Sequence, residues 1–313
     1  MPLLGALAGS TVRSSGLFKW PNLPTWPSII SGDVFYRYTP TNIFGVLGSG
    51  STGSVSRLLQ TSYLSMLING QGRGVLGNGA GGGVTITNYQ IVYDPTGTAS
   101  FNYSGYNDAF QPGTPHELGF FEIGGASGFF IGGQNNASTV TGLVADNGTV
   151  YSWTPPDGSV IVMLGSGGSN GTAIFQYRAT DRVLRMHMSY FNTTASTKSV
   201  RMIRGGDPDL DGYSTNNSIL GTTKVSGTGT TTGKTIGIYC PGNGFTTNTG
   251  IISGWGTNNP MDTVLSGTNA GNGDNAIYAA VNVGNVNAGQ SVGLNVYYTF
   301  GVGETDAFSR LGV

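Results

Sequence analysis

Charged residues and histidines are scarce in this sequence. The 313 residues include 14 Lys and Arg, 15 Asp and Glu, and 2 His, so 9% of the chain is charged, against roughly 25% in average soluble proteins. The net charge of -1 and the pI near 6.1 predict no basic surface of the kind that binds nucleic acid. We therefore exclude DNA and RNA as partners.

Cysteine and long apolar runs are also lacking. Cys240 is the only cysteine, so no disulfide forms within the chain, and stability is expected from packing and from association with other chains. No apolar run approaches the roughly 20 residues that span a bilayer. The opening MPLLGALAGSTVRSSGLF has no basic region before its short apolar stretch, which Gly5 and Gly9 interrupt, so we expect neither a signal peptide nor membrane insertion.

Glycine, in contrast, is abundant, with 54 positions that follow no G-X-Y period, and aromatic residues make up 11% of the chain. This composition excludes collagen and argues against disorder. It predicts many β-strands joined by tight turns.

Residue patterns support this prediction along the second half of the chain. In VLRMHMSYFN, from residue 183 to 192, polar and apolar side chains alternate with the period of two of a half-buried strand. Further strands are predicted at residues 84–94, 98–106, 116–124, 127–133, 160–166, 172–180, 198–206, 234–242, 275–284 and 291–301. Because this number exceeds the need of a seven-stranded immunoglobulin-type domain, we predict a large two-sheet antiparallel β-sandwich over residues 84–313.

The first 83 residues have a different character. Residues 1–50 contain five prolines and show no sustained periodicity, so we predict an extended N-terminal arm that anchors the protein in an assembly through Phe18, Trp20 and Trp26. Residues 51–83 form a connecting segment. Within it, the apolar spacing from residue 54 to 68 favours a short helix, with a strand hairpin as the alternative.

Two longer stretches, VLRMHMSYFNTTASTKSVRMIRGGDPDLDGYSTNNSI and GNGDNAIYAAVNVGNVNAGQSVGLNVYYTFG, resemble large β-sandwich modules of secreted bacterial adhesin-like proteins and of phage virion proteins. The opening GALAGSTVRSSGLF is similar to the short segments by which some tail-fibre proteins dock onto a particle. The resemblance implies a structural role in a tailed-bacteriophage virion.

Residue patterns for catalysis are weak. Neither His116 nor His187 lies in a nucleophile-elbow context, and both are expected to be ordinary strand residues. Glycoside chemistry needs two carboxylates, and no local pattern selects a pair from Glu117, Glu122, Asp146 and Asp157. We therefore predict that the chain is not an enzyme.

The most specific motif is DPDLDG, from residue 207 to 212. Asp207, Asp209 and Asp211 stand two residues apart before a Gly turn and can converge on one hard cation, so calcium is the candidate cofactor. Ser218 replaces the glutamate that an EF-hand requires. The alternative is a solvated acidic loop with an Asx turn.

These inferences lead to a phage structural protein at the particle surface, associated with the tail as a tail fibre or adhesin and acting in assembly or host attachment. The expected partners are further copies in a symmetric homo-oligomer, other virion proteins and a host surface glycan. Two alternatives remain, a capsid cement or decoration protein and a carbohydrate-active enzyme on a β-sandwich.

Overall fold

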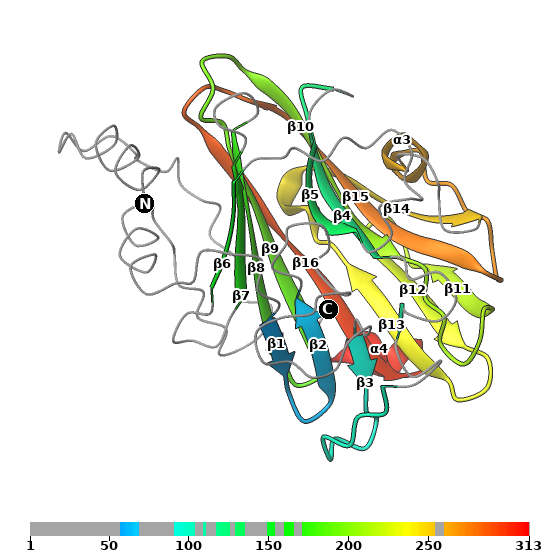
Figure 1. Cartoon of the computed structure of the whole chain (residues 1–313). Helices are drawn as coiled ribbons and strands as arrows, with labels where there is room; N and C mark the ends of the chain where they lie inside the picture. Colours follow the sequence, from blue (N-terminus) through cyan, green and yellow to red (C-terminus); the bar gives the residue numbers. More distant parts are fainter. Residues whose placement is uncertain are drawn as a thin grey trace.

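Antiparallel β-strands make up most of the structure, a computed structural model that describes residues 57–68, 91–103, 109–110, 117–125, 129–134, 149–153, 160–165, 171–253 and 260–312. The strands form two large sheets and one small sheet (Figure 1). The predicted all-β sandwich is therefore confirmed. Its predicted arm, with Phe18, Trp20 and Trp26, lies outside the described residues.

The largest sheet has eight strands, and β9 and β16 lie side by side at its centre (Figure 1). In spatial order it consists of β11 (Thr215–Ile219), β12 (Lys224–Gly229), β13 (Lys234–Tyr239), β16 (Ser291–Val302), β9 (Val183–Phe191), β8 (Thr172–Thr180), β7 (Val160–Gly165) and β6 (Thr149–Trp153). Consecutive hairpins build most of it. The β8–β9 turn places Asp181 at a φ of 50°, a conformation that Asp tolerates better than most residues.

The second layer consists of a five-stranded and a three-stranded sheet. The five-stranded sheet has the order β14 (Thr246–Ser253), β15 (Asn275–Val286), β10 (Lys198–Gly206), β4 (Glu117–Ile123) and β5 (Phe129–Gln134). The small sheet has the order β1 (Arg57–Gln60), β2 (Leu64–Ile68) and β3 (Ile91–Tyr93). Three short helical segments are also present, η2 (Gly242–Gly244), α3 (Met261–Leu265) and α4 (Glu304–Ser309).

The hydrophobic core lies between these layers. The side chains of β9 alternate as predicted, because Leu184, Met186, Met188 and Tyr190 face this core. The strand is not half-buried, however, since Val183 and Arg185 on the other face are buried as well. Each fully buried side chain of this size contributes roughly 1.5–3 kcal/mol. The Phe121 ring of β4 meets the Phe175 ring of β8 edge-on at 5.3 Å, which joins the two large sheets.

The small sheet packs against the same core. The rings of Tyr93 in β3 and Phe300 in β16 lie 5.7 Å apart, and the guanidinium of Arg182 lies 4.5 Å from the Tyr63 ring centroid. Leu64, Met66 and Ile68 of β2 are fully buried in the core. The helix predicted over residues 54–68 is therefore wrong. The hairpin alternative describes this segment, since β1 and β2 pair antiparallel and all five side chains of β2 are buried.

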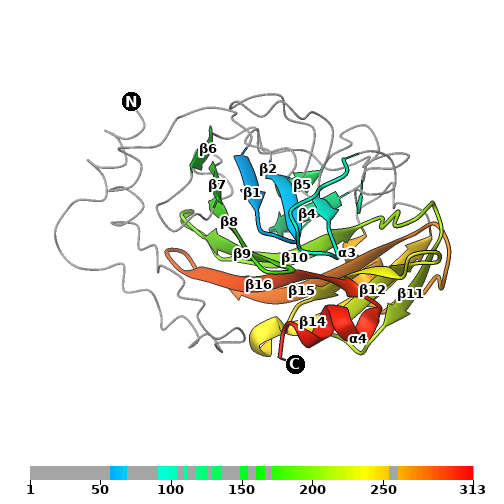
Figure 2. The same ribbon diagram turned by 90° about the horizontal axis from the view of Figure 1, so that it is seen from below.

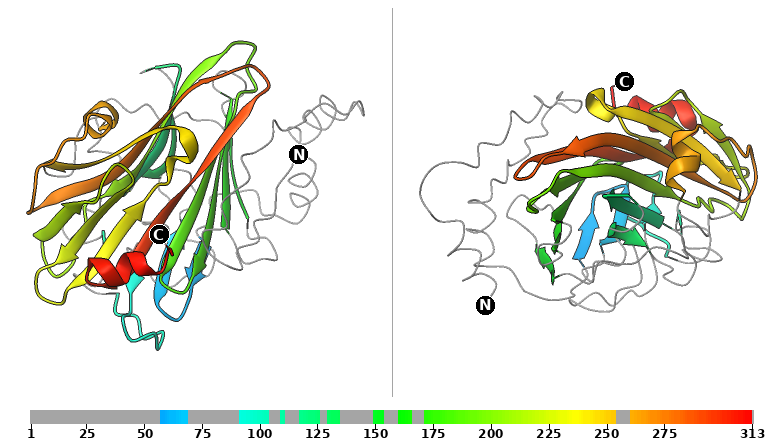
Figure 3. Two further views of the ribbon diagram at one scale, coloured as in Figure 1. Left: turned by 180° about the vertical axis from the view of Figure 1, so that it is seen from behind. Right: turned by 90° about the horizontal axis from the view of Figure 1, so that it is seen from above.

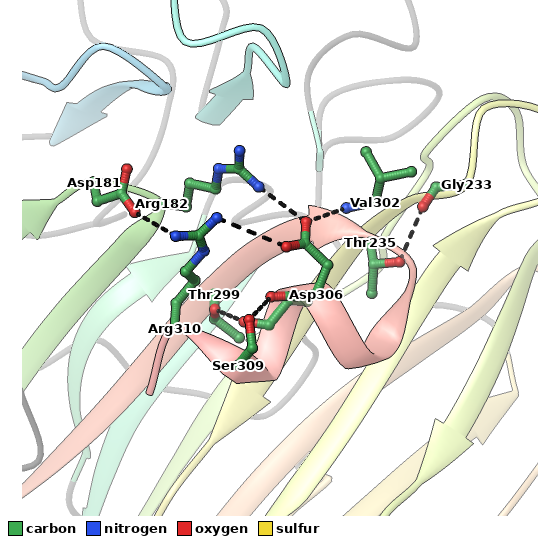
Figure 4. Close-up of polar contacts among 10 residues, drawn as sticks. Asp181, Arg182, Gly233, Thr235, Thr299, Val302, Asp306, Ser309 and Arg310 are labelled. Carbon is green, nitrogen blue, oxygen red and sulfur yellow. Dashed lines mark hydrogen bonds and ion pairs between the residues drawn. The ribbon is translucent and has the colours of Figure 1, made fainter. Parts of the chain in front are cut away.

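The helix α4 covers the opposite face of the large sheet. Figures 2 and 3 show it on the side of β16 away from β1 and β2, where Phe308 packs with Tyr239 and Tyr297. Figure 4 shows the polar contacts that hold it: the carboxylate of Asp306 accepts hydrogen bonds from Arg182 Nη1 and from the Val302 backbone N–H, both at 2.9 Å.

Another strand prediction needs correction. Residues 98–103, predicted as a strand, form a loop whose Thr98 and Ser100 backbone N–H groups donate to the Asp94 carboxylate. Residues 226–235, SGTGTTTGKT, have a Gly- and Thr-rich composition typical of a loop, but they contain most of β12 and the start of β13. Among the described residues, no helix is both long and apolar enough to cross a membrane.

Candidate functional site

A group of three carboxylates forms where two strands of the five-stranded sheet meet. β10 ends at Gly206, which pairs with Ile277 near the start of the antiparallel neighbour β15. The residue after β10 and the residue before β15 are therefore neighbours in space. These residues are Asp207 and Asp274, and Asp209 joins them.

The three side chains converge closely. Each offers one carboxylate oxygen, and these oxygens all lie within 4.8 Å of one another. Asp207 and Asp209 are buried, with 5% and 3% of their surface exposed, whereas Asp274 is exposed. The acidic cluster, as we call Asp207, Asp209 and Asp274, thus has a buried floor and one side open to solvent.

The hydrogen bonding of Asp209 is incomplete. Its backbone N–H donates to the carbonyl oxygen of Ala109 at 3.1 Å, which fixes the loop. Its carboxylate oxygen Oδ1 is buried and has no hydrogen-bond partner in the described part of the chain. A buried carboxylate oxygen without a partner is costly, and native structures contain few of them.

The surroundings of the cluster disfavour three negative charges. Burial, and next the charge of Asp274, raise the pKa of Asp207 to about 7. Burial, and next the charges of Asp207 and Asp274, raise the pKa of Asp209 to about 8. In the described part of the chain, no Lys or Arg forms a salt bridge with any of the three. The arrangement is therefore suited to binding protons or a cation at neutral pH.

Glycines of β12 make room for the acidic loop. A Cβ atom at Gly227 would lie 2.6 Å from Cγ of Pro208, and one at Gly229 would overlap the Asp211 carboxylate. The loop of residues 207–212 therefore lies directly on β12. This packing explains why a strand so rich in glycine forms here, and why its composition resembles that of a loop.

The loop before β15 is fixed at two sheet edges. Its residue Asn269 forms a bridge with Ile251 of β14, and Gly273 forms a bridge with Thr215 of β11. The Asn272 side chain accepts a hydrogen bond from the Asn217 backbone N–H at 2.9 Å. The backbone that carries Asp274 is therefore held in place before any ligand binds.

The predicted trio of Asp207, Asp209 and Asp211 is only partly brought together. The carboxylate of Asp211 accepts hydrogen bonds from the backbone N–H groups of Thr231 and Thr232, at 3.2 and 2.6 Å. It holds the β12–β13 turn, and Asp274 takes the third place in the cluster. Sequence reasoning missed Asp274 because its Gly- and Asn-rich loop carries no motif that connects it with residues 207–212.

A buried ion pair lies in the core nearby. Arg204 Nη2 and Glu117 Oε1 are 2.6 Å apart with no exposed surface on either side chain, and the Tyr298 hydroxyl donates to the same Glu117 oxygen at 2.7 Å. Burial raises the pKa of Glu117, although Arg204 and the Tyr298 hydrogen bond act in the opposite direction. Because no part of the pair is exposed, we assign it a structural role.

Side chains of His187, Ser189 and Asn295 form a second constellation, on the outer face of the large sheet. His187 Nε2 lies 2.6 Å from Ser189 Oγ, and His187 Nδ1 lies 3.0 Å from Asn295 Oδ1. This order resembles a nucleophile with its base. The strand β9 is paired with β16 on one side and with β8 on the other, however, so the backbone N–H groups around His187 and Ser189 are used within the sheet and do not supply an oxyanion hole.

Burial, the leading cause, lowers the pKa of His187 to about 4. The imidazole is therefore neutral at physiological pH, and it stabilises the sheet face as a hydrogen-bonded residue. This agrees with the prediction of an ordinary strand histidine. His116 lies outside the described residues.

No protein-family model matches the chain, and no curated protein matches its sequence. Its fold is similar to several solved structures. One is a polysaccharide lyase, which is 13% identical and aligns with 83% of this chain and 34% of its own at a TM-score of 0.35. A candidate aldose 1-epimerase of Escherichia coli K12 is 10% identical, with coverages of 79% and 99% and a TM-score of 0.46.

A third solved structure is a bacterial glucoamylase in complex with acarbose. It is 12% identical, with coverages of 85% of this chain and 36% of its own, at a TM-score of 0.40. The chain thus spans about a third of the lyase and of the glucoamylase, and nearly all of the epimerase candidate.

The comparisons correct one prediction. We predicted a chain that is not an enzyme, whereas all three of these similar structures carry enzyme titles. Likeness at this distance concerns the fold and transfers neither a reaction nor a substrate to this chain.

Proposed function

We propose that this chain is a carbohydrate-active enzyme on a β-sandwich and that the acidic cluster is its sugar-contacting site. The observation that carries the proposal is the convergence of Asp207, Asp209 and Asp274 within 4.8 Å at one end of a sheet. A cleft with paired carboxylates is what such an enzyme requires.

The chemistry of the cluster fits a sugar. Sugar hydroxyl groups both donate and accept hydrogen bonds, and a carboxyl group accepts them when it is ionised and also donates one when it is protonated. Asp274 is exposed, so a ligand reaches the cluster from that side, while the buried Asp209 has a carboxylate oxygen that no described residue hydrogen-bonds. Tyr213 follows on the same loop with 52% of its surface exposed, and an aromatic ring stacks well on the apolar face of a sugar.

Turnover by the purified full-length chain tests the proposal. A panel of polysaccharides and free sugars is assayed for new reducing ends, for ultraviolet absorbance of unsaturated products and for exchange of anomers by NMR. These readouts cover hydrolysis, elimination and epimerisation. We expect turnover in one of them, and a fall of about 100-fold or more in Asp209→Asn and Asp274→Asn.

Asp181→Asn is the matched control. It removes an exposed carboxylate at a positive φ that Asn also tolerates, so its turnover should equal that of the parent chain. Absence of turnover on every substrate, or full activity in Asp209→Asn, would show that the proposal is wrong.

The place of the protein on a phage particle remains a separate proposal, supported by the sequence resemblance alone. The tail-associated position, the capsid-decoration alternative and the symmetric homo-oligomer all stay predictions. Antibody labelling of intact virions, viewed by electron microscopy, tests the first two, and the mass of the purified protein in solution tests the third.

A further inference from the structure

We propose that the acidic cluster is a binding site for one divalent cation of the calcium type, with Asp207, Asp209 and Asp274 as its protein ligands. The inference concerns the same residues as the proposed function, but it needs no sugar. It also replaces the local trio of the DPDLDG motif with a site built from two loops.

The distances suit one shared cation. Calcium binds oxygen ligands at about 2.3–2.6 Å, so two ligands on opposite sides of the ion are about 5 Å apart. The three carboxylate oxygens lie within 4.8 Å of one another. A single ion between them therefore reaches all three with little movement of the side chains.

The unpartnered oxygen is an independent sign of a ligand. Asp209 is 3% exposed, its Oδ1 has no hydrogen-bond partner among the described residues, and one oxygen of its carboxylate belongs to the cluster. A bound cation would satisfy this oxygen directly. It would also supply the positive charge that the Lys and Arg residues of the described segments do not provide through salt bridges.

The donor set selects the class of metal. All three ligands are carboxylates, and hard oxygen donors favour calcium or magnesium over zinc or copper. Calcium takes 6–8 ligands in flexible geometry, and the exposed side at Asp274 leaves positions for water or for sugar hydroxyls. Magnesium demands a stricter octahedron, so we expect calcium to bind more tightly.

The test measures thermal unfolding of the full-length chain, with calcium chloride or with EDTA, and titrates calcium by calorimetry. We expect calcium to raise the Tm of the parent chain and EDTA to lower it. Asp274→Asn and Asp209→Asn should bind calcium at least about tenfold more weakly. In EDTA they should melt at or above the parent temperature, because each removes repulsion within the cluster.

Two controls make the result specific. Asp211→Asn changes the acidic loop outside the cluster and should keep the parent affinity for calcium, as should Asp181→Asn on a distant turn. No heat of binding and no shift of Tm with calcium would overturn the proposal. So would full affinity in Asp274→Asn, or a loss confined to Asp211→Asn.

The outcome is separable from that of the proposed function. Calcium binding without turnover on any sugar would retain the cation site and remove the enzyme. Turnover that is unchanged in EDTA, in a chain that gives no heat of binding with calcium, would retain the proposed enzyme and remove the cation site.

Discussion

Breaking the buried ion pair between Glu117 and Arg204 should destabilise the protein strongly. With 2.6 Å between Nη2 and Oε1, the attraction is about 6 kcal/mol at an effective dielectric constant of about 20. Desolvation of each ion offsets several kcal/mol of this attraction. Replacing one partner removes the attraction but leaves the other charge buried, so we expect Glu117→Gln to cost about 3–5 kcal/mol.

The substitution is chosen to preserve shape. The amide oxygen of the introduced glutamine side chain would still accept the hydrogen bond that the Tyr298 hydroxyl gives to Glu117 Oε1 at 2.7 Å, so the loss reports on charge. Arg204 is fully buried and its side chain packs directly against Gly119, where a Cβ atom would overlap Arg204 Nη1. The neighbouring rings of Tyr177 and Tyr298, at 5.8 and 5.7 Å from the guanidinium carbon, offset only part of the lost charge.

Urea unfolding of Glu117→Gln, Arg204→Met and the double variant measures the coupling. The double variant should be more stable than the sum of the single losses predicts, by about 2–3 kcal/mol. Arg310→Ala is the control, since its ion pairs at 3.7 and 3.8 Å are at the surface, and it should change stability by about 0.5 kcal/mol or less. Additive single losses, or a loss under about 1 kcal/mol in Glu117→Gln, would refute the reasoning.

Three further outcomes are expected. Folding lowers the pKa of His187 to about 4, so below pH 6.5 the unfolded chain binds a proton that the folded chain does not. Between pH 6.5 and pH 4, urea unfolding should show that the free energy of unfolding of the parent falls by about 1–3 kcal/mol more than that of His187→Gln. An equal fall in both proteins would contradict this prediction. Gly205→Ala would push a Cβ into the Ile277 carbonyl oxygen and should lower the free energy of unfolding by more than about 2 kcal/mol, so an unchanged stability would show that the β10–β15 contact can relax. Cys240 is fully buried and its pKa is raised by burial to about 12, so a thiol reagent should label it only after unfolding, and rapid labelling of the native protein would count against the burial.

Some elements could be predicted because their patterns are local. β8 and β10 have the predicted bounds, residues 172–180 and 198–206. In β9 the period of two is visible because alternate apolar side chains face the core, although most of the other face is buried as well. Such strands can be predicted without knowing which strands pair with them, because alternation along the sequence assigns each side chain to one face of the sheet.

Other elements depend on what packs against them. The run LSMLI of β2 is buried on both faces, so it shows no alternation, and its spacing is equally compatible with a helix. The Gly- and Thr-rich β12 has the composition of a loop, and its glycines are explained only by the acidic loop that packs on this strand. Neither the burial of both faces of β2 nor the packing of the acidic loop on β12 can be predicted from the sequence of the segment alone.

The sequence by itself determined an all-β chain with little charge, the alternating strands, and two of the three clustered carboxylates, Asp207 and Asp209. The tertiary structure alone decided the third carboxylate. Asp274 joins the cluster because antiparallel pairing of β10 with β15 brings the end of one strand beside the start of the other. Asp211 is closer in sequence, but its carboxylate is held by hydrogen bonds from the β12–β13 turn. Contacts between strands, and not spacing along the chain, therefore decide which side chains meet.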